Sequence, residues 1–272
     1  MQIPPETPLA LPPPNRLIQT MCCFSGKVTF VQNTRIFARM GQAGRQGLVY
    51  QMNVGAPADL AMILPLPVAA DSKEDALKFI DLSGYPKFFS HLRAAFPVPR
   101  SDDGSDSDPF GAQPLAAQLK VHEVGSYEAS FVPKLADFAR LDARFRLPDD
   151  VWKNLPQFAD YGFAVFKLKQ GDREIHPMAF TFPTRHPAKL FFPTVHIHDG
   201  QVHAEEEFDH DLYCQVRKTG RFAMTRWEES SGPAQRTCNI ERSRGFLAQG
   251  QHLHRLSLTG KHKNEDILLE TA

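Results

Sequence analysis

The sequence has no hydrophobic run long enough to cross a membrane, and it has no excess of either charge. A membrane-spanning helix needs about 18 or more consecutive apolar residues, and no stretch of the 272 residues approaches that. Lys and Arg number 31, and Asp and Glu also number 31. A chain without net charge lacks the positive field that draws proteins to nucleic acids and anionic membranes. We therefore expect no nucleic-acid or membrane partner. Because residues 1–15 do not resemble a secretory signal, we expect a cytoplasmic location.

Cysteines and the common catalytic motifs are also scarce. The four cysteines are too few for a disulfide framework in a chain of this length, so we expect reduced thiols. The sequence contains no G-x-G-x-x-G, G-x-x-x-x-G-K-[ST], G-x-S-x-G or H-E-x-x-H. Those absences exclude the usual nucleotide-binding, α/β-hydrolase and zinc-protease classes, and we expect no nucleotide cofactor.

Phenylalanine and proline are abundant, with 21 and 22 residues. Many aromatic residues favour a β-rich core, and frequent prolines limit long helices. We therefore expect an α+β, strand-rich fold with mostly antiparallel sheets and a few short helices. Two of these helices are predicted at residues 73–80 and 84–95. In the second, Phe88, Phe89 and Leu92 share one apolar face.

Composition divides the chain into four parts. We expect a Pro-rich flexible arm at 1–20, a first β-rich half with helices at 21–97, a disordered acidic loop at 98–117, and a second β-rich half with a His-rich hairpin at 118–272. The two halves share a pattern of strand, polar loop, strand and proline, seen at 49–68 and 165–184. That pattern predicts two similar halves.

Several short motifs occur in an order that is similar to a known protein family. They are Cys22–Cys23, Asn33–Arg35, Asp59–Val68, Phe79–Pro86, Val124–Tyr127, Leu155–Lys169 and Pro177–Phe182. Together they resemble a bacterial family catalogued only as a domain of unknown function, with an N-terminal Cys-Cys pair and a strand ending in Pro-Val-Pro. The resemblance covers about two thirds of the chain and implies a fold lineage. It implies no activity, because the family has none to transfer.

The most specific local feature is the segment TVHIHDGQVHAEE at 194–206. Asp199–Gly200 between alternating residues is typical of a two-residue hairpin turn. In that hairpin His196, His198 and His203 would project from one face. Facing Cβ atoms in a hairpin lie about 4.5–5.5 Å apart, so three imidazoles can converge on one ion at Zn–N distances of about 2.0–2.1 Å.

This pattern predicts a soluble metal-binding protein. A three-histidine site suits zinc, and also copper or iron, and it leaves a coordination position open for water or substrate. His210 is the candidate fourth ligand and Glu205 the candidate general base of a metal-assisted hydrolase or redox enzyme. The alternative is a polar, solvated histidine face on a non-enzymatic interaction module. The partner would then be an unknown protein or a small molecule.

Cys22 is a second catalytic candidate. If translation starts at Met21 rather than Met1, removal of that methionine exposes Cys22 as an N-terminal nucleophile whose free amine acts as the base. This hypothesis predicts an amidohydrolase. The alternative is that the Cys22–Cys23 pair consists of small buried hydrophobic residues, as free cysteines commonly do.

Overall fold

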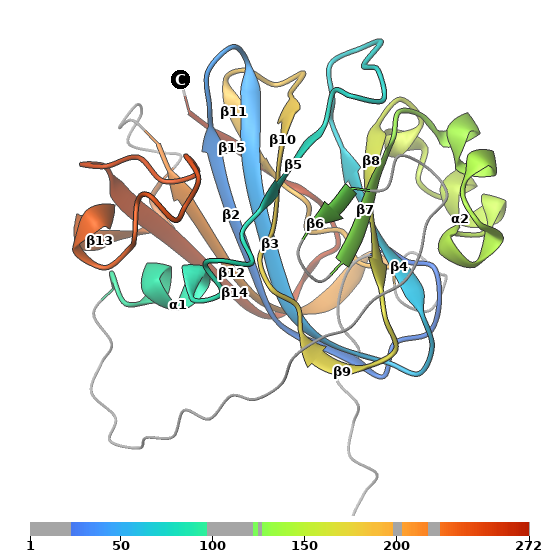
Figure 1. The fold of residues 1–272 in the computed structure, drawn as a ribbon, viewed down its shortest axis with the longest axis horizontal. Coiled ribbons are helices and arrows are strands. Elements are labelled where there is room, and N and C mark those ends of the chain that lie inside the picture. The colour runs from blue at the N-terminus through green and yellow to red at the C-terminus, as the bar shows by residue number, and fades with distance from the viewer. Residues whose placement is uncertain (1–22, 97–121, 125–126, 198–202, 217–223, 272) are drawn as a thin grey trace, which may run out of the picture.

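Two β-sheets face each other across a hydrophobic core, and each sheet carries a second layer on its outer face (Figure 1). The coordinates are a computed structural model that describes residues 23–96, 122–124, 127–197, 203–216 and 224–271. The predicted arm at 1–20 and the predicted acidic loop at 98–117 lie outside this range. Within the described residues no helix is long and apolar enough to span a bilayer.

The smaller sheet has five strands in the order β1-β4-β8-β7-β6, all paired antiparallel. Their bounds are Cys23–Phe24 for β1, Leu60–Leu66 for β4, His122–Val124 for β6, Tyr127–Val132 for β7 and Gly162–Leu168 for β8. β4 is buried along its whole length. A strand covered on both faces reads as a continuous apolar run, which is why its sequence does not alternate.

The larger sheet has the order β13-β14-β12-β2-β3-β10-β5, with β9 paired to β3. The strand bounds are Phe30–Met40 (β2), Arg45–Ala56 (β3), Lys78–Asp81 (β5), Gly171–Glu174 (β9), Met178–Pro183 (β10), Glu205–Gln215 (β12), Glu228–Pro233 (β13) and His252–Lys263 (β14). β12 and β2 run parallel, and the other neighbours pair antiparallel. β11 (Lys189–Phe192) and β15 (Ile267–Glu270) form a separate antiparallel pair. This architecture confirms the expected strand-rich α+β fold.

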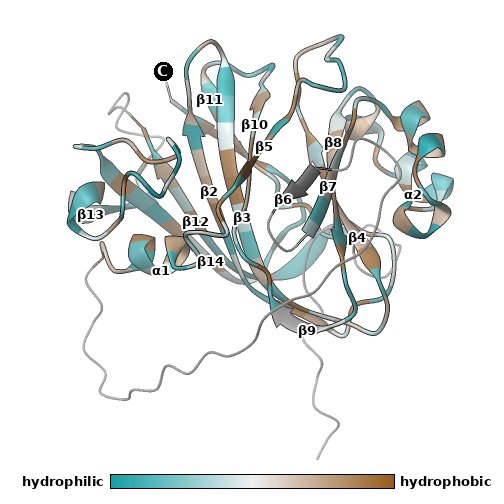
Figure 2. Ribbon diagram, viewed as in Figure 1, coloured by the Kyte–Doolittle hydropathy of each residue, from teal (hydrophilic) through white to brown (hydrophobic). Residues whose placement is uncertain are grey.

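Buried apolar side chains form three clusters. Figure 2 colours the hydrophobic residues along the ribbon brown. The main core lies between the sheets. The smaller sheet is covered outside by three 3₁₀ helices and one α-helix: η1 (Leu135–Arg140), η2 (Ala143–Phe145), α2 (Asp149–Lys153) and η3 (Pro156–Phe158). The larger sheet is covered outside by α1 (Phe88–Arg93) and by residues 234–247, which begin with the 3₁₀ helix η4 (Ala234–Arg236).

The two predicted helices have different outcomes. The second is confirmed in α1, where Phe88, Phe89 and Leu92 are buried against the larger sheet. The first is wrong, because the chain forms strand β5 at the end of that segment and pairs it with β10. The Phe79 ring lies 5.7 Å from that of Phe166, so aromatic packing and strand pairing outweigh local helix propensity.

The two halves contribute strands to both sheets. β4 from the first half pairs with β8 from the second, and β3 pairs with β10. The segments 49–68 and 165–184 both cross between the sheets, but in opposite directions: the first runs from β3 to β4, and the second from β8 to β10. The halves therefore share one core.

Candidate functional site

The turn between β14 and β15 holds the segment 194–197 through two side chains. The Asp266 Oδ1 atom accepts hydrogen bonds from the backbone N–H groups of Thr194, at 2.8 Å, and Val195, at 3.0 Å. The Asn264 Oδ1 atom accepts from the His196 N–H at 2.7 Å. The Asn264 amide nitrogen donates to the backbone carbonyls of His196 and His203, at 2.9 and 3.0 Å. The Asn264 and Asp266 side chains in this turn therefore supply hydrogen-bond partners for the backbone of residues 194–196, which has no regular strand pairing of its own.

The same segment joins the two sheets. Ile197 forms an isolated parallel bridge with Cys23 of β1, and the Phe24 N–H donates to the Ile197 carbonyl at 3.3 Å. One side of the segment thus contacts the smaller sheet. Its other side contacts β12 of the larger sheet and the turn between β14 and β15.

A buried histidine pair lies at this junction. The Nε2 atoms of His196 and His210 are 3.3 Å apart, and the ring planes differ by 11°. The Phe208 ring packs against both imidazoles, with centroid distances of 4.2 and 4.8 Å. One ring donates and the other accepts, so the bond needs at least one neutral imidazole with a free Nε2 lone pair.

Burial sets the protonation of His210. Burial lowers the pKa of His210 well below its usual value, and the neighbouring His196 and His262 lower that pKa further. A charged imidazole at His210 would lose its water, and the neighbouring groups that act on it are histidines. The His210 ring is therefore neutral at physiological pH.

The structure brings together two of the predicted metal ligands, His196 and His210. The described residues contain no group of three or more His, Cys, Asp or Glu side chains placed to hold an ion. His203 is exposed, whereas His198 and Cys22 lie outside the described residues. The three-histidine site for zinc, copper or iron, and the N-terminal nucleophile, stay predictions.

The described flanks of the hairpin expected around Asp199–Gly200 pair with other strands, and the hairpin itself stays a prediction. β11 pairs with β15, and Ile197 bridges to β1. Glu205 and Glu206 of β12 pair with Lys263 and His262 of β14, and β2 lies beside β12 from His210 to Gln215. The turn itself lies outside the described residues.

Glu205, the candidate general base, lies at an open pocket lined by Ala204, Glu205, Lys261, Lys263, Asn264 and Glu265. It is exposed and stands opposite Lys263 across the β12–β14 ladder. Acid–base catalysis needs a carboxylate within hydrogen-bond reach of a reacting group. The charged side chains that line the pocket are instead of both signs: Glu205, Glu265, Lys261 and Lys263.

Sequence reasoning missed Asn264 and Asp266. Burial raises the pKa of Asp266 to about 7. The hydrogen bonds that its carboxylate accepts from the backbone N–H groups of Val195 and Thr194 act in the opposite direction and lower that pKa. The signal was present as Asn-Glu-Asp between two apolar strand segments. Asn and Asp at a turn commonly bond to backbone groups.

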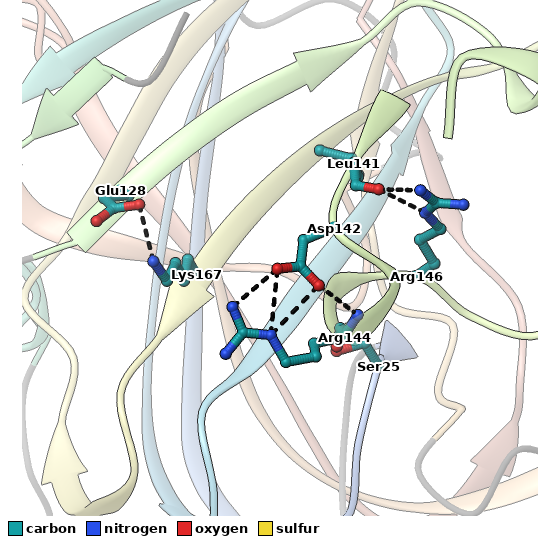
Figure 3. Close-up of polar contacts among 7 residues, drawn as sticks. All are labelled: Ser25, Glu128, Leu141, Asp142, Arg144, Arg146 and Lys167. Atoms are coloured by element: carbon teal, nitrogen blue, oxygen red, sulfur yellow. Dashed lines mark hydrogen bonds and ion pairs between the residues drawn. The ribbon is translucent and has the colours of Figure 1, made fainter. Parts of the chain in front are cut away.

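The cysteines and the main polar cluster of the smaller sheet have structural roles. Cys23, Cys214 and Cys238 are buried free thiols. Figure 3 shows the Asp142 carboxylate facing Arg144, and Lys167 facing Glu128. The Ser25 hydroxyl donates to the Arg144 carbonyl at 2.8 Å and accepts from the Ala61 N–H at 2.9 Å. These bonds attach the helical layer to the sheet.

No protein-family model and no curated protein matches the chain. Solved structures of a viral protein do match it. The crystal structure of baculovirus P35 aligns with a TM-score of 0.51 and 13% identity, covering 92% of this chain and 99% of that one. This likeness shows the fold.

Two further P35 structures are similar at lower scores. A mutated P35 solved after caspase cleavage aligns with a TM-score of 0.49 and 14% identity, covering 89% of this chain and 100% of that one. The caspase-8/P35 complex aligns with a TM-score of 0.45 and 12% identity, covering 88% and 96%. The resemblance to the bacterial family of unknown function stays a prediction.

Proposed function

We propose that this chain is a non-enzymatic protein-interaction module whose partner is a protease of the caspase class. The observation that carries the proposal is the fold match to baculovirus P35 over 92% of this chain and 99% of that one. P35 itself has been solved with caspase-8 and after caspase cleavage. Because one fold can host unrelated functions, the likeness supplies the hypothesis and an experiment must decide it.

The chemistry of the described site supports binding over catalysis. Active sites place a nucleophile, a base and polar donors around one concave pocket. Here the buried polar groups serve the fold, because His196 bonds to His210 and the Asn264 and Asp266 side chains bond to backbone groups. The pocket beside Glu205 is lined by surface charges.

The test is to mix the full-length chain with active caspase-8 and follow hydrolysis of a peptide substrate. We expect residual caspase activity to fall as the chain is added, and a complex to co-elute in gel filtration. Mass spectrometry of any fragments then locates a cleavage position. The heat-unfolded chain and a serine protease are the controls. Unchanged caspase activity at large molar excess, with no complex, would overturn the proposal.

A further inference from the structure

Three buried oxygen atoms without hydrogen-bond partners lie on neighbouring strands in the middle of the larger sheet. Among the described residues, the carboxylate and amide oxygens of this kind are Asp209 Oδ1, Gln51 Oε1 and Asn53 Oδ1. They come from β12 and β3, which lie on either side of β2. We name these three residues the oxygen cluster. A buried acceptor without a donor costs free energy, and Gln51 is only 3% exposed, so the cluster needs an explanation.

The three side chains of the oxygen cluster share the outer face of the sheet. Their neighbours in sequence belong to the main core between the two sheets: Phe208, Tyr50, Met52 and Val54. Successive side chains of a strand point to opposite faces. The cluster therefore points away from the main core. The Thr34 hydroxyl also lacks a partner, but Thr34 pairs with His210 and shares the inner face with it.

A bulge in β2 brings the Asp209 carboxylate between the two amides. The register of β2 against β3 shifts at Asn33 and Thr34, so these two residues stand opposite Met52. Asn33 has a φ of 54°, and its N–H donates to Asp209 Oδ2 at 2.7 Å. Met52 lies between the two amide residues of the cluster in sequence. The carboxylate thus reaches β2 at the level between them, with its Oδ1 atom left over.

The spacing of the strands suits an ion shared by these oxygens. Because the Asp209 side chain already reaches β2, about one strand spacing of about 4.8 Å separates its carboxylate from β3. Calcium–oxygen bonds of about 2.3–2.6 Å join opposite oxygens that lie about 5 Å apart. A water molecule donates only two hydrogen bonds and would leave one of the three acceptors without a donor.

The charge at the oxygen cluster also favours a cation. Burial raises the pKa of Asp209 above its usual value, against the N–H groups of Asn33 and Thr34, which lower it. Asp209 forms no ion pair with a described residue. Arg35 stands opposite Gln51, but its guanidinium pairs with Glu174 at 3.3 Å, across β3 from Asp209. The buried carboxylate therefore lacks a compensating positive charge.

We propose that the oxygen cluster binds a calcium ion on the outer face of the larger sheet. Calcium takes six to eight oxygen ligands from carboxylates, amide carbonyls and water, and its geometry is flexible. The cluster supplies one carboxylate and two amide oxygens, and water supplies the remaining ligands. Because the site has a single carboxylate, we expect weak binding, with a Kd of about 10⁻⁴–10⁻³ M. The ion would connect β12 to β3 across the bulge in β2.

The test follows thermal unfolding of the full-length chain, freed of metal with EDTA and then titrated with calcium chloride. Asp209→Asn removes the charge and keeps an oxygen for the Asn33 N–H. Asp150→Asn, at an exposed position of α2, makes the same change in net charge and is the control. Gln51→Leu removes an amide oxygen at similar volume, and it carries the test if Asp209→Asn does not fold.

At about 10 mM calcium we expect the thermal midpoint of wild type and Asp150→Asn to rise by about 2–6 °C. The rise should disappear in Asp209→Asn and fall by at least about half in Gln51→Leu. Equilibrium dialysis should show one calcium ion bound per wild-type chain. Without calcium, Asp209→Asn should be no less stable than wild type, since it removes a buried charge that has no counter-charge.

Several results would overturn the calcium site. They are no rise in the wild-type midpoint, an equal rise in Asp209→Asn, and an unchanged rise in Gln51→Leu. An equal rise with sodium chloride at the same ionic strength would mean a general salt effect. An equal rise with magnesium chloride would overturn the assignment to calcium. None of these measurements depends on a caspase, so they are decided separately from the proposed function.

Discussion

The His196–His210 pair shows how burial changes the chemistry of a residue type. In water an imidazole titrates near pH 6.5, but these two rings are buried with Phe208 against them and bond to each other. The same residues on an exposed strand would be free to bind an ion or a proton. At His210 the neutral form is the stable one, because burial penalises the charged form and the neighbouring His196 and His262 lower its pKa further.

This neutrality predicts a loss of stability in acid. The native state holds the pKa of His210 below its unfolded value, so the contribution is complete above about pH 6.5 and is lost as the pH falls below it. We expect the free energy of unfolding to include a fall of up to about 1.4 kcal/mol per pH unit from this residue. Urea unfolding at several pH values measures it.

His210→Gln should flatten that acid slope, and His252→Gln, at a side chain that is 40% exposed, is the control for the loss of an imidazole at a solvated position. Asp266 contributes in the opposite sense, since its raised pKa favours the native state as the pH falls through about 7. That contribution is present in wild type and in both variants, so the difference between them isolates His210. Parallel slopes in all three proteins would contradict the prediction.

At the scale of elements, the turn between β14 and β15 connects two strands and also holds residues 194–196 in place by hydrogen bonds. Asn264 and Asp266 bond to residues 194–196, which are about 70 positions earlier in the chain. The held segment then bridges to β1 at Cys23. A short turn therefore links the edge of one sheet to the strands of the other.

Removal of the Asp266 acceptor should loosen this connection. Asp266→Ala leaves the N–H groups of Thr194 and Val195 without their acceptor, which we expect to lower the free energy of unfolding by about 1–3 kcal/mol. Hydrogen exchange of those two amides should accelerate. Asp266→Asn retains an acceptor oxygen and should exchange more slowly than Asp266→Ala. Glu265→Ala, at the exposed residue between Asn264 and Asp266, is the control. Fast exchange in this control would contradict the role of Asp266.

At the scale of the whole molecule, strands from both halves complete one core. Phe166 of β8 contacts Phe79 of β5 and Phe180 of β10, with ring centroids 5.7 and 5.8 Å apart. These contacts connect the smaller sheet to the larger one. Loss of packing at this position should therefore affect both sheets together.

Phe166→Ala should lower the free energy of unfolding by about 3–5 kcal/mol, because it removes a fully buried ring and leaves a cavity. Leu268→Ala should change it by less than about 0.5 kcal/mol, since that side chain is 43% exposed. Thermal unfolding followed by circular dichroism compares the two. A small effect of Phe166→Ala would mean that the sheets do not depend on this contact.

Local pattern was sufficient for the fold class and for some elements. The apolar face of Phe88, Phe89 and Leu92 located α1, and the apolar run at 60–66 is a buried strand. Such patterns are readable because each element must bury one face or both, and that requirement sets the period of its own residues.

By itself, then, the sequence determined the strand-rich fold class, the helix at α1, the absence of net charge and the pattern of histidines. Only the tertiary structure decided which strands pair. It paired Ile197 with Cys23 of β1 and Glu205 with Lys263 of β14, and it brought Asn264 and Asp266 to residues 194–196. The physical reason is that periodicity encodes which face of an element is buried. The partner on that face is chosen by hydrogen bonds and packing between residues far apart in the chain.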